Sequence, residues 1–388
     1  MKYLDLYPEG LKPQRLYCPK CGDGMSLVFD VFDERVENLQ IEIKNLPYLM
    51  CPQCKQKYLP DRSRISLIKI FEDNSTTGKT KFHSVRQKID KRFVFGKVDF
   101  IYDPDDYFYI PGLIREGNDG FLTPVFFNKN VLIKFYNWPE YNISFASKTY
   151  GTIEKGNREY MVSFGINKSN KVVMWLGDIS GLPDEEQHYL RSENIMSDHD
   201  IGSEFYDAQI EAEFTKLTPE DELIKAWSRM HNAFEKHFTE KSSHLDNESL
   251  ELINIIIRPA VFTEKENKHV IDNLNKLCIE TLNSANLEKL LTEVDKTAPR
   301  GTLKRLELLL QTHFQSNDIS KLLSPFFVLY DLRISFLHLT SKEKQKETID
   351  SALLRLNLRN GNFSLLYDEL IKQITDSYNS IAKILSLA

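Results

Sequence analysis

The stretch Leu329–Leu339, LYDLRISFLHL, indicates the fold of the C-terminal half of the chain. Before it, Ser324-Pro325 supplies a helix N-cap and a first-position proline. After it, the capping-box pattern Thr340–Glu343 begins the next helix. We therefore expect one helix from about 325 to 339. Apolar residues surround it on nearly all sides, as is typical of a helix at the centre of a bundle: Phe326, Phe327, Val328, Leu329, Leu332, Ile334, Phe336 and Leu337.

Residues 216–388 as a whole have the periodicity of helices. Thr218 and Pro219 give a second N-cap and first-position proline, and Thr263 with Glu266 gives a further capping box. Apolar residues recur at helical spacing after both signals and again near the C-terminus. The sequence predicts an all-helical bundle over this region.

Two pairs of cysteines mark the N-terminal region, residues 1–75. They are the C-x2-C knuckles CPKC and CPQC, and 29 residues separate them. The segments MSLVFDVF and LQIEIKNL between them predict a β-hairpin. Two such knuckles at the tips of tight turns supply four tetrahedral sulfur ligands for a structural zinc ion, with no position left for water. The predicted ligands of this zinc ribbon are Cys18, Cys21, Cys51 and Cys54.

Two other uses of these cysteines are less consistent with the sequence. A pair of disulfides would need an oxidising compartment, which nothing in the sequence indicates. A thioredoxin-like redox site would need one C-x-x-C pair rather than two matched ones. The fifth cysteine, Cys278, lies on a helical pattern, where we expect a buried small apolar residue.

The region 95–215 has the pattern of a β domain. Short apolar segments such as VFFNKNVLIKFYNW, REYMVSFGI and KVVMWLGDI alternate with turn-forming clusters. This spacing predicts antiparallel strands. From Gly181 to Phe205 we expect a long ordered loop with one helical turn. Within it Asp198, His199, Asp200 and Glu204 lie close together. Such groups bind metals, although we favour a solvated acidic loop.

Composition limits the class of protein. The chain has 388 residues, enough for two or three domains, and its 41% hydrophobic and 27% charged content is ordinary for a globular protein. It has neither an apolar run of transmembrane length nor a signal-peptide pattern, so we expect a cytoplasmic protein. The patterns of P-loop, dinucleotide-binding and serine-hydrolase sites are absent, which leaves those activities without support.

The charge is unevenly distributed along the chain. The net charge is −6, but residues 1–100 carry 18 Lys and Arg against 13 Asp and Glu. The stretch 79–97 alone holds seven Lys and Arg against one Asp. Arg86, Lys88 and Arg92 are therefore candidate contacts to nucleic-acid phosphates. A solvated basic linker explains the same composition.

Arg333 and His338 form an R-x4-H pattern on the apolar helix of the predicted bundle. In this the segment resembles the signature of the HEPN superfamily, helical-bundle domains found in many bacterial toxin and phage-defence ribonucleases. The resemblance implies a metal-independent endoribonuclease in which two subunits bring their motifs together in a cleft. His338 would assist attack of the ribose 2′-OH, and Arg333 would stabilise the developing charge.

One feature keeps a structural role open for the same pair. The family usually has a polar residue directly after the arginine, and this chain has Ile334. Arg333 would then be paired with an acidic neighbour such as Asp331, and His338 would be a hydrogen-bonded residue at the helix end.

The sequence thus predicts a multidomain α+β protein. Its parts are a zinc ribbon with four cysteine ligands (1–75), a basic linker (76–94), a central antiparallel β domain (95–215) and a C-terminal all-α HEPN-like bundle (216–388). We expect RNA cleavage or RNA binding in a bacterial defence or toxin-like setting, with RNA and a second copy of the chain as partners. The homodimer would form through the helical domain. The alternative is a non-enzymatic sensor or adaptor whose β domain binds a protein or small ligand.

Overall fold

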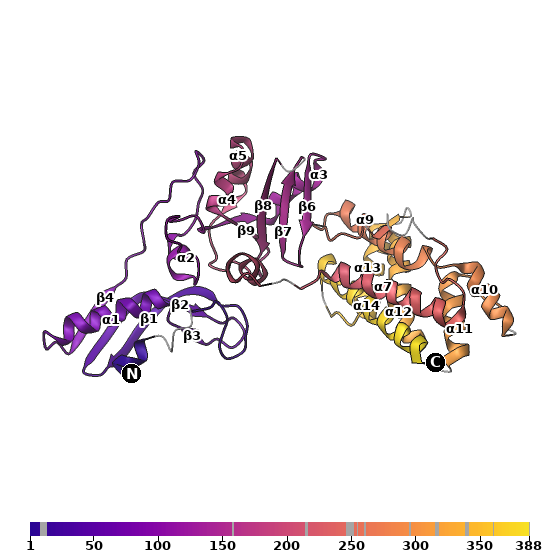
Figure 1. Ribbon diagram of the computed structural model, residues 1–388, viewed down its shortest axis with the longest axis horizontal. Coiled ribbons are helices and arrows are strands. Elements are labelled where there is room, and N and C mark those ends of the chain that lie inside the picture. Colours follow the sequence, from indigo (N-terminus) through magenta and orange to yellow (C-terminus); the bar gives the residue numbers. More distant parts are fainter. Residues whose placement is uncertain are drawn as a thin grey trace. The chain divides into compact units, whose positions relative to one another are not determined.

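The computed structural model describes residues 1–7, 14–156, 159–213, 216–245, 252–253, 255–259, 261–294, 296–314, 318–337, 341–359 and 361–387. The chain divides into two compact units, Met1–Lys216 and Leu217–Ala388 (Figure 1). The first unit combines two sheets with short helices, and the second is built of helices. The protein is therefore mixed α+β, with a cysteine cluster near its N-terminus. No helix in the described ranges is long and apolar enough to cross a membrane.

The hairpin expected between the cysteine pairs is present. Strands β1 (Ser26–Val36) and β2 (Leu39–Met50) pair antiparallel, with a bulge between Asp30 and Phe32. Helix α1 (Asp61–Ser75) and the 3₁₀ turn η1 (Tyr3–Leu6) pack on this sheet. One face of the hairpin buries its alternate apolar side chains against them, so a local core forms from Leu6, Phe32, Val36, Leu39, Ile41, Ile43, Leu46, Leu67 and Phe71.

The second edge of β2 is also paired. Strand β3 (Lys57–Tyr58) pairs antiparallel with its end, and β4 (Lys81–Val85) runs parallel to its beginning. The strand β4 lies in the stretch that the sequence indicated as a linker. Its side chains are exposed except for the half-buried Phe82, so it shows no apolar alternation from which a strand would be predicted.

The second sheet has the strand order β10-β5-β9-β8-β7-β6, and every pair in it is antiparallel, as the sequence predicted. Trp175 and Phe205 stack in its core with ring centroids 4.6 Å apart. The strands are β5 (Pro124–Asn128), β6 (Tyr141–Phe145), β7 (Tyr150–Lys155), β8 (Tyr160–Ile166), β9 (Lys171–Trp175) and β10 (Asn194–Ile195). Among them lie α2 (Pro104–Tyr109), η2 (Lys129–Val131), α3 (Leu132–Asn137), α4 (Leu176–Ser180), α5 (Asp184–Ser192), α6 (Ser203–Tyr206) and the π-helical η3 (Asp207–Glu211).

The segment 181–205 is more regular than the expected loop, since it contains α5, β10 and part of α6. Polar side chains hold much of it in place. Asn194 accepts a hydrogen bond from the Ile101 amide at 2.6 Å and donates to the carbonyl oxygens of Ile101 and Phe126 at 3.0 and 2.9 Å. Because Asn194 is a buried polar residue, β10 lacks the alternation of apolar side chains from which a strand is predicted.

The second unit is a helical bundle around one core. Thr218 caps α7 and Thr263 caps α9 through their side chains, as predicted from the sequence. Helix α12 contacts α9, α11, α13 and α14, so it lies at the centre of the bundle as expected. The helices are α7 (Pro219–Phe238), α9 (Glu264–Asn275), the π-helical η4 (Lys276–Glu280), α10 (Ser284–Glu293), α11 (Thr302–Phe314), α12 (Ile319–Leu337), α13 (Lys342–Arg355) and α14 (Phe363–Leu387).

The beginning of the central helix differs from the prediction. Helix α12 begins at Ile319 rather than at 325, so Pro325 lies inside it. Ile319 and Leu323 are buried in the bundle core, and their burial offsets the one hydrogen bond that a proline removes. The predicted end of this helix at 339 and the predicted cap Thr340 lie outside the described residues. The N-cap of α13 is Ser341, whose hydroxyl accepts from the Lys344 amide at 3.3 Å.

Candidate functional site

The two cysteine knuckles have the same backbone geometry. In the first, the Cys18 carbonyl accepts a hydrogen bond from the Gly22 amide at 2.8 Å. In the second, the Cys51 carbonyl accepts from the Lys55 amide at 3.0 Å. Gly22 and Lys55 both adopt positive φ angles, +75° and +59°. Each knuckle is therefore a tight turn that presents two sulfur atoms on one side.

The four sulfur atoms converge. The ligand atoms of Cys18, Cys21, Cys51 and Cys54 all lie within 4.8 Å of one another. The Sγ–Sγ distances are 3.6 Å for Cys18–Cys54 and 3.4 Å for Cys21–Cys51, far beyond a disulfide bond of about 2.05 Å. Four sulfurs at about 2.3 Å from a tetrahedral ion would be about 3.8 Å apart. The cluster thus fits a metal ion with four thiolate ligands.

Neighbouring groups favour the thiolate form of two of these cysteines. Burial raises the pKa of the Cys18 thiol, but hydrogen bonds from the Tyr58 hydroxyl at 3.6 Å and from backbone amides outweigh it and lower this pKa to about 6. The Cys54 amide, 3.5 Å from the Cys51 sulfur, is the largest cause that lowers the pKa of Cys51. These donors would remain as partners of metal-bound sulfur.

Arg333 lies near the end of α12, and His338 lies outside the described residues. The Nη2 atom of Arg333 is 3.3 Å from Oε1 of Glu280, the last residue of η4, and the two side chains are 31% and 47% exposed. Its Nε is buried without a hydrogen-bond partner in the described part of the chain. Tyr330 and Leu337, one turn away on either side, are each 42% exposed. The guanidinium is thus only partly satisfied and lies on an accessible helix face.

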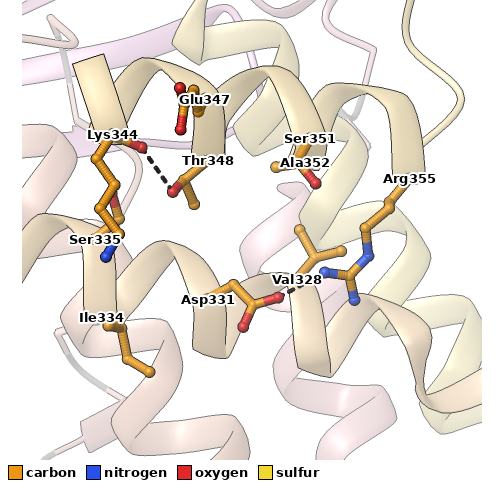
Figure 2. A pocket seen from close by; sticks show the side chains of 10 residues that line it. All are labelled: Val328, Asp331, Ile334, Ser335, Lys344, Glu347, Thr348, Ser351, Ala352 and Arg355. Carbon is orange, nitrogen blue, oxygen red and sulfur yellow. Dashed lines mark hydrogen bonds and ion pairs between the residues drawn. The ribbon is translucent and has the colours of Figure 1, made fainter. Parts of the chain in front are cut away.

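Asp331, the acidic neighbour considered as a partner of Arg333, pairs with a different arginine. Its Oδ2 atom lies 2.6 Å from Nη1 of Arg355 on α13. Figure 2 shows this pair bridging a groove of about 350 Å³ between α12 and α13, with Lys344 and Ser335 toward its other end. Among the acidic candidates, Asp331 is therefore not the described partner of Arg333, and Glu280 is.

A larger pocket, of about 820 Å³, lies on another side of α12. We call it the α11 pocket, because α11 begins in its wall. Four segments of the helical unit line it: His244, Ile279–Ser284, Arg300–Lys304 and the Phe327–Asp331 part of α12. Glu280, the partner of Arg333, is one of its lining residues. No local sequence pattern predicts this pocket, because the segments that form its walls lie up to 87 positions apart, from 244 to 331.

The three basic residues predicted to contact phosphates have carboxylate partners within the first unit. Arg86 is 11% exposed; its Nη1 lies 3.0 Å from Oδ2 of the buried Asp105. The Nζ of Lys88 is 2.7 Å from Asp103. Arg92 lies 2.6 Å from Asp99 and is 67% exposed.

The geometry separates Arg86 from the other two basic residues. Lys88 and Arg92 line one groove of about 410 Å³, and Arg86 is not among its lining residues. Arg86 lies instead over the rings of Phe29 and Tyr109, at 5.6 and 4.9 Å. Phosphate binding by the three stays a prediction, and it would require each of them to exchange an aspartate for a phosphate.

The acidic cluster at 198–204 is a hydrogen-bonded network rather than the solvated loop we favoured. His199 Nδ1 lies 2.7 Å from Oδ1 of the fully buried Asp106. The Asn167 amide donates to Asp198 at 2.9 Å, and Glu204 accepts from the Thr149 amide at 2.8 Å. These groups join the loop to its neighbours in the fold, and only the four cysteines of the described chain are placed to hold a metal ion.

Comparison of the chain with protein-family models, with curated proteins and with solved structures gave no match. The chemistry of the clusters described above is therefore the basis for assigning a function.

Proposed function

We propose that the protein binds RNA through its helical unit and cleaves it with Arg333 and His338, as a HEPN-like domain would. We further propose that the cysteine cluster holds a structural zinc ion in a zinc ribbon. The setting we propose is the bacterial cytoplasm, in a defence or toxin-like system.

The observation that carries this proposal is the state of Arg333. An arginine in the central helix of a bundle is normally buried and fully paired, because an unsatisfied cation in the core is costly. Arg333 is instead partly exposed, has an unsatisfied Nε and shares its carboxylate partner. The part of this guanidinium that solvent reaches can donate charge-assisted hydrogen bonds to an incoming phosphate.

The proposed chemistry needs no metal ion in the reaction. The ribose 2′-OH would transfer its proton to the His338 imidazole while its oxygen attacks the adjacent phosphorus. The bond from phosphorus to the 5′-oxygen of the next nucleotide would break, and this oxygen would take up a proton from water, giving a 2′,3′-cyclic phosphate and a 5′-OH end. Arg333 would stabilise the negative charge that accumulates on the phosphoryl oxygens.

A dimer is the second part of the proposal. Leu337 places a large, partly exposed side chain beside Arg333 on one face of α12. Pairing of this face with that of a second chain would bury Leu337 and bring two Arg333 residues to one cleft, in a closed two-fold arrangement. Light scattering at micromolar concentration should then give twice the mass of the 45.3 kDa chain.

The decisive experiment is cleavage of a single-stranded RNA of defined sequence by the full chain. Cleavage in the presence of EDTA, products with 2′,3′-cyclic phosphate ends and no cleavage of the matching DNA are expected. His338→Ala should slow cleavage by roughly 10²–10⁴-fold. A wild-type protein that neither cleaves nor binds RNA would refute the proposal.

A non-enzymatic adaptor is the second candidate, and one observation favours it. Arg333 already has a carboxylate within ion-pair distance, at 3.3 Å from Glu280. A folded wild type that does not cleave RNA but binds a protein or small ligand through its β domain would indicate this function instead.

A further inference from the structure

The α11 pocket is held open by a specific arrangement of helix ends. Helices α10 and α11 both begin in its wall, at Ser284 and Thr302. Arg305, which is not part of the lining, ties the two starts together: its Nη1 donates to the carbonyl and hydroxyl oxygens of Ser284 at 3.1 and 2.9 Å, and its Nε donates to the Pro299 carbonyl at 3.0 Å. The pocket is therefore preformed.

The charged residues that line the pocket favour the binding of an anion. Its two acidic residues each have an arginine partner outside the lining, since Glu280 pairs with Arg333 and Asp331 with Arg355. Arg300 and Lys304 line the same pocket, are exposed to solvent and form no ion pair with any described residue. The charges of the two acidic residues are thus neutralised by their arginine partners, and the positive charges of Arg300 and Lys304 remain to attract an anionic ligand.

Another part of the wall is aromatic. Phe327 and Tyr330, both on α12, line the pocket, and Tyr330 is 42% exposed. The flat rings of bases stack on such side chains in single-stranded nucleic-acid sites. The volume of about 820 Å³ lies in the range that holds one small organic ligand.

The backbone at the entrance of α11 adds donors on the side of the two cations. The first amides of a helix have no carbonyl partner within the helix, and they favour negative charge. Gly301, directly before α11, has a φ of +96° and open space where a Cβ would be. A ligand can therefore come close to the backbone there, between Arg300 and Lys304.

We propose that the α11 pocket binds a nucleoside monophosphate group, with the phosphate at Arg300 and Lys304 and the base against Phe327 and Tyr330. The group belongs either to a free nucleotide or to the terminal nucleotide of an RNA strand, and both present the same chemistry. The inference does not depend on RNA cleavage, because it concerns binding alone and uses Arg333 only as the ion-pair partner of Glu280.

The test is isothermal titration of the full chain with adenosine 5′-monophosphate and with adenosine. Two RNA hexamers of one sequence, one with a 5′-phosphate and one with a 5′-hydroxyl, separate the two sources. The variant is Arg300→Gln with Lys304→Gln. The matched control, Lys342→Gln with Lys346→Gln, removes the same charge from exposed lysines of α13 that line neither the α11 pocket nor the groove between α12 and α13.

The wild type should bind the monophosphate at least tenfold more tightly than adenosine. The pocket variant should weaken this binding on the order of 100-fold, about tenfold for each lost cation, and the control should leave it unchanged. Tyr330→Leu should weaken the binding of the monophosphate and leave the binding of inorganic phosphate unchanged. Tight binding only of the 5′-phosphorylated hexamer identifies the ligand as an RNA end.

Two results would overturn the inference. One is a wild type that binds none of these probes, and the other is a pocket variant that behaves like the control. Failure of the proposed ribonuclease is distinguishable, because His338→Ala should abolish cleavage while monophosphate binding persists.

Discussion

Arg333 and Asn275 share one acceptor: Oε1 of Glu280 lies 3.3 Å from the Arg333 Nη2 atom and 2.8 Å from the Asn275 Nδ2 atom. Arg333 and Glu280 are both reached by solvent, with exposed fractions of 31% and 47%. Ion pairs of this kind contribute about 0–1 kcal/mol to stability. The pair is too weak to account for an arginine in the central helix of the bundle.

Arg333→Ala should therefore change stability little and function strongly. We expect the free energy of unfolding of the helical unit to fall by less than about 1.5 kcal/mol, since a solvent-reached pair and part of one side chain are lost. RNA cleavage should be lost. Urea denaturation followed by circular dichroism, beside the cleavage assay, measures both. A fall of roughly 3–5 kcal/mol, the cost of breaking a buried pair, would mean that Arg333 is structural.

The cysteine cluster predicts one metal ion per chain. Protein purified without chelator should contain one equivalent of zinc by elemental analysis, and Cys18→Ser should lower this content and unfold the region around the hairpin, because metal binding supplies folding energy to a small site. Cys278→Ser is the matched control, since Cys278 is buried in the helical core away from the cluster and should leave the zinc content unchanged. Metal-free protein with a fully folded hairpin would contradict the assignment.

The features that can be predicted from the sequence are those with local signals. The knuckles are recognisable because a C-x2-C turn places its ligands within four residues. The caps of α7 and α9 are recognisable for the same reason, since Thr218 and Thr263 each bond to an amide three residues away. The hairpin follows from alternation in β1 and β2, whose buried residues lie mostly on one face.

The features that the sequence does not reveal depend on contacts between distant residues. The partner of Arg333 is Glu280, 53 positions earlier, while Asp331, two positions away, pairs with Arg355. Asp106 binds His199 across 93 positions, so local composition alone favours a solvated acidic loop. The predicted start of α12 lies too late in the chain because it rested on Pro325. A proline favours the first turn of a helix, but it is tolerated inside a helix when core contacts extend that helix toward its N-terminus.

The helical unit should lose stability as the pH falls from 7 toward 4 because of His231. Burial lowers the pKa of this histidine from 6.5 to about 4. Its Nδ1 is 2.6 Å from the Ser242 hydroxyl, and its ring lies 4.4 Å from that of Trp227. Above 6.5 the group is neutral in both the folded and the unfolded chain. Between 6.5 and about 4 only the unfolded chain takes up the proton, so stability is lost across this window.

The measurement is the urea midpoint of the helical unit at several pH values. His231→Gln should flatten the dependence between pH 6.5 and 4, since glutamine does not titrate. His269→Gln, at an exposed position of α9, is the control and should follow the wild type. If the wild type and His231→Gln have parallel curves, burial of the neutral imidazole does not contribute to the pH dependence.

The ion cluster around Arg258 predicts an asymmetry between its members. Arg258 is 9% exposed, pairs with Asp368 and lies 3.9 Å from Glu220, which is 3% exposed. Its guanidinium also faces the rings of Phe262 and Tyr367, at 5.3 and 5.6 Å. One buried cation thus lies beside two carboxylates from different helices, Glu220 of α7 and Asp368 of α14.

Arg258→Met should lower the free energy of unfolding by roughly 3–5 kcal/mol, because it leaves buried carboxylate charge without its cation. Glu220→Gln should cost far less, since burial raises the pKa of this carboxyl and its charged form is already disfavoured in the folded chain. A carboxyl with a raised folded-state pKa gives its full stabilisation below the unfolded value of 4.5 and loses it as the pH rises through the folded value. The loss of unfolding free energy caused by Arg258→Met should therefore become smaller as the pH is lowered and Glu220 takes up a proton.

Urea denaturation of both Arg258→Met and Glu220→Gln at two pH values tests this asymmetry. Lys268→Ala, in the exposed Lys268–Glu264 pair, is the control and should cost less than about 0.5 kcal/mol, because a solvated pair within one helix contributes little. Equal losses for Arg258→Met and Glu220→Gln, or a deficit independent of pH, would show that the cluster acts through packing alone.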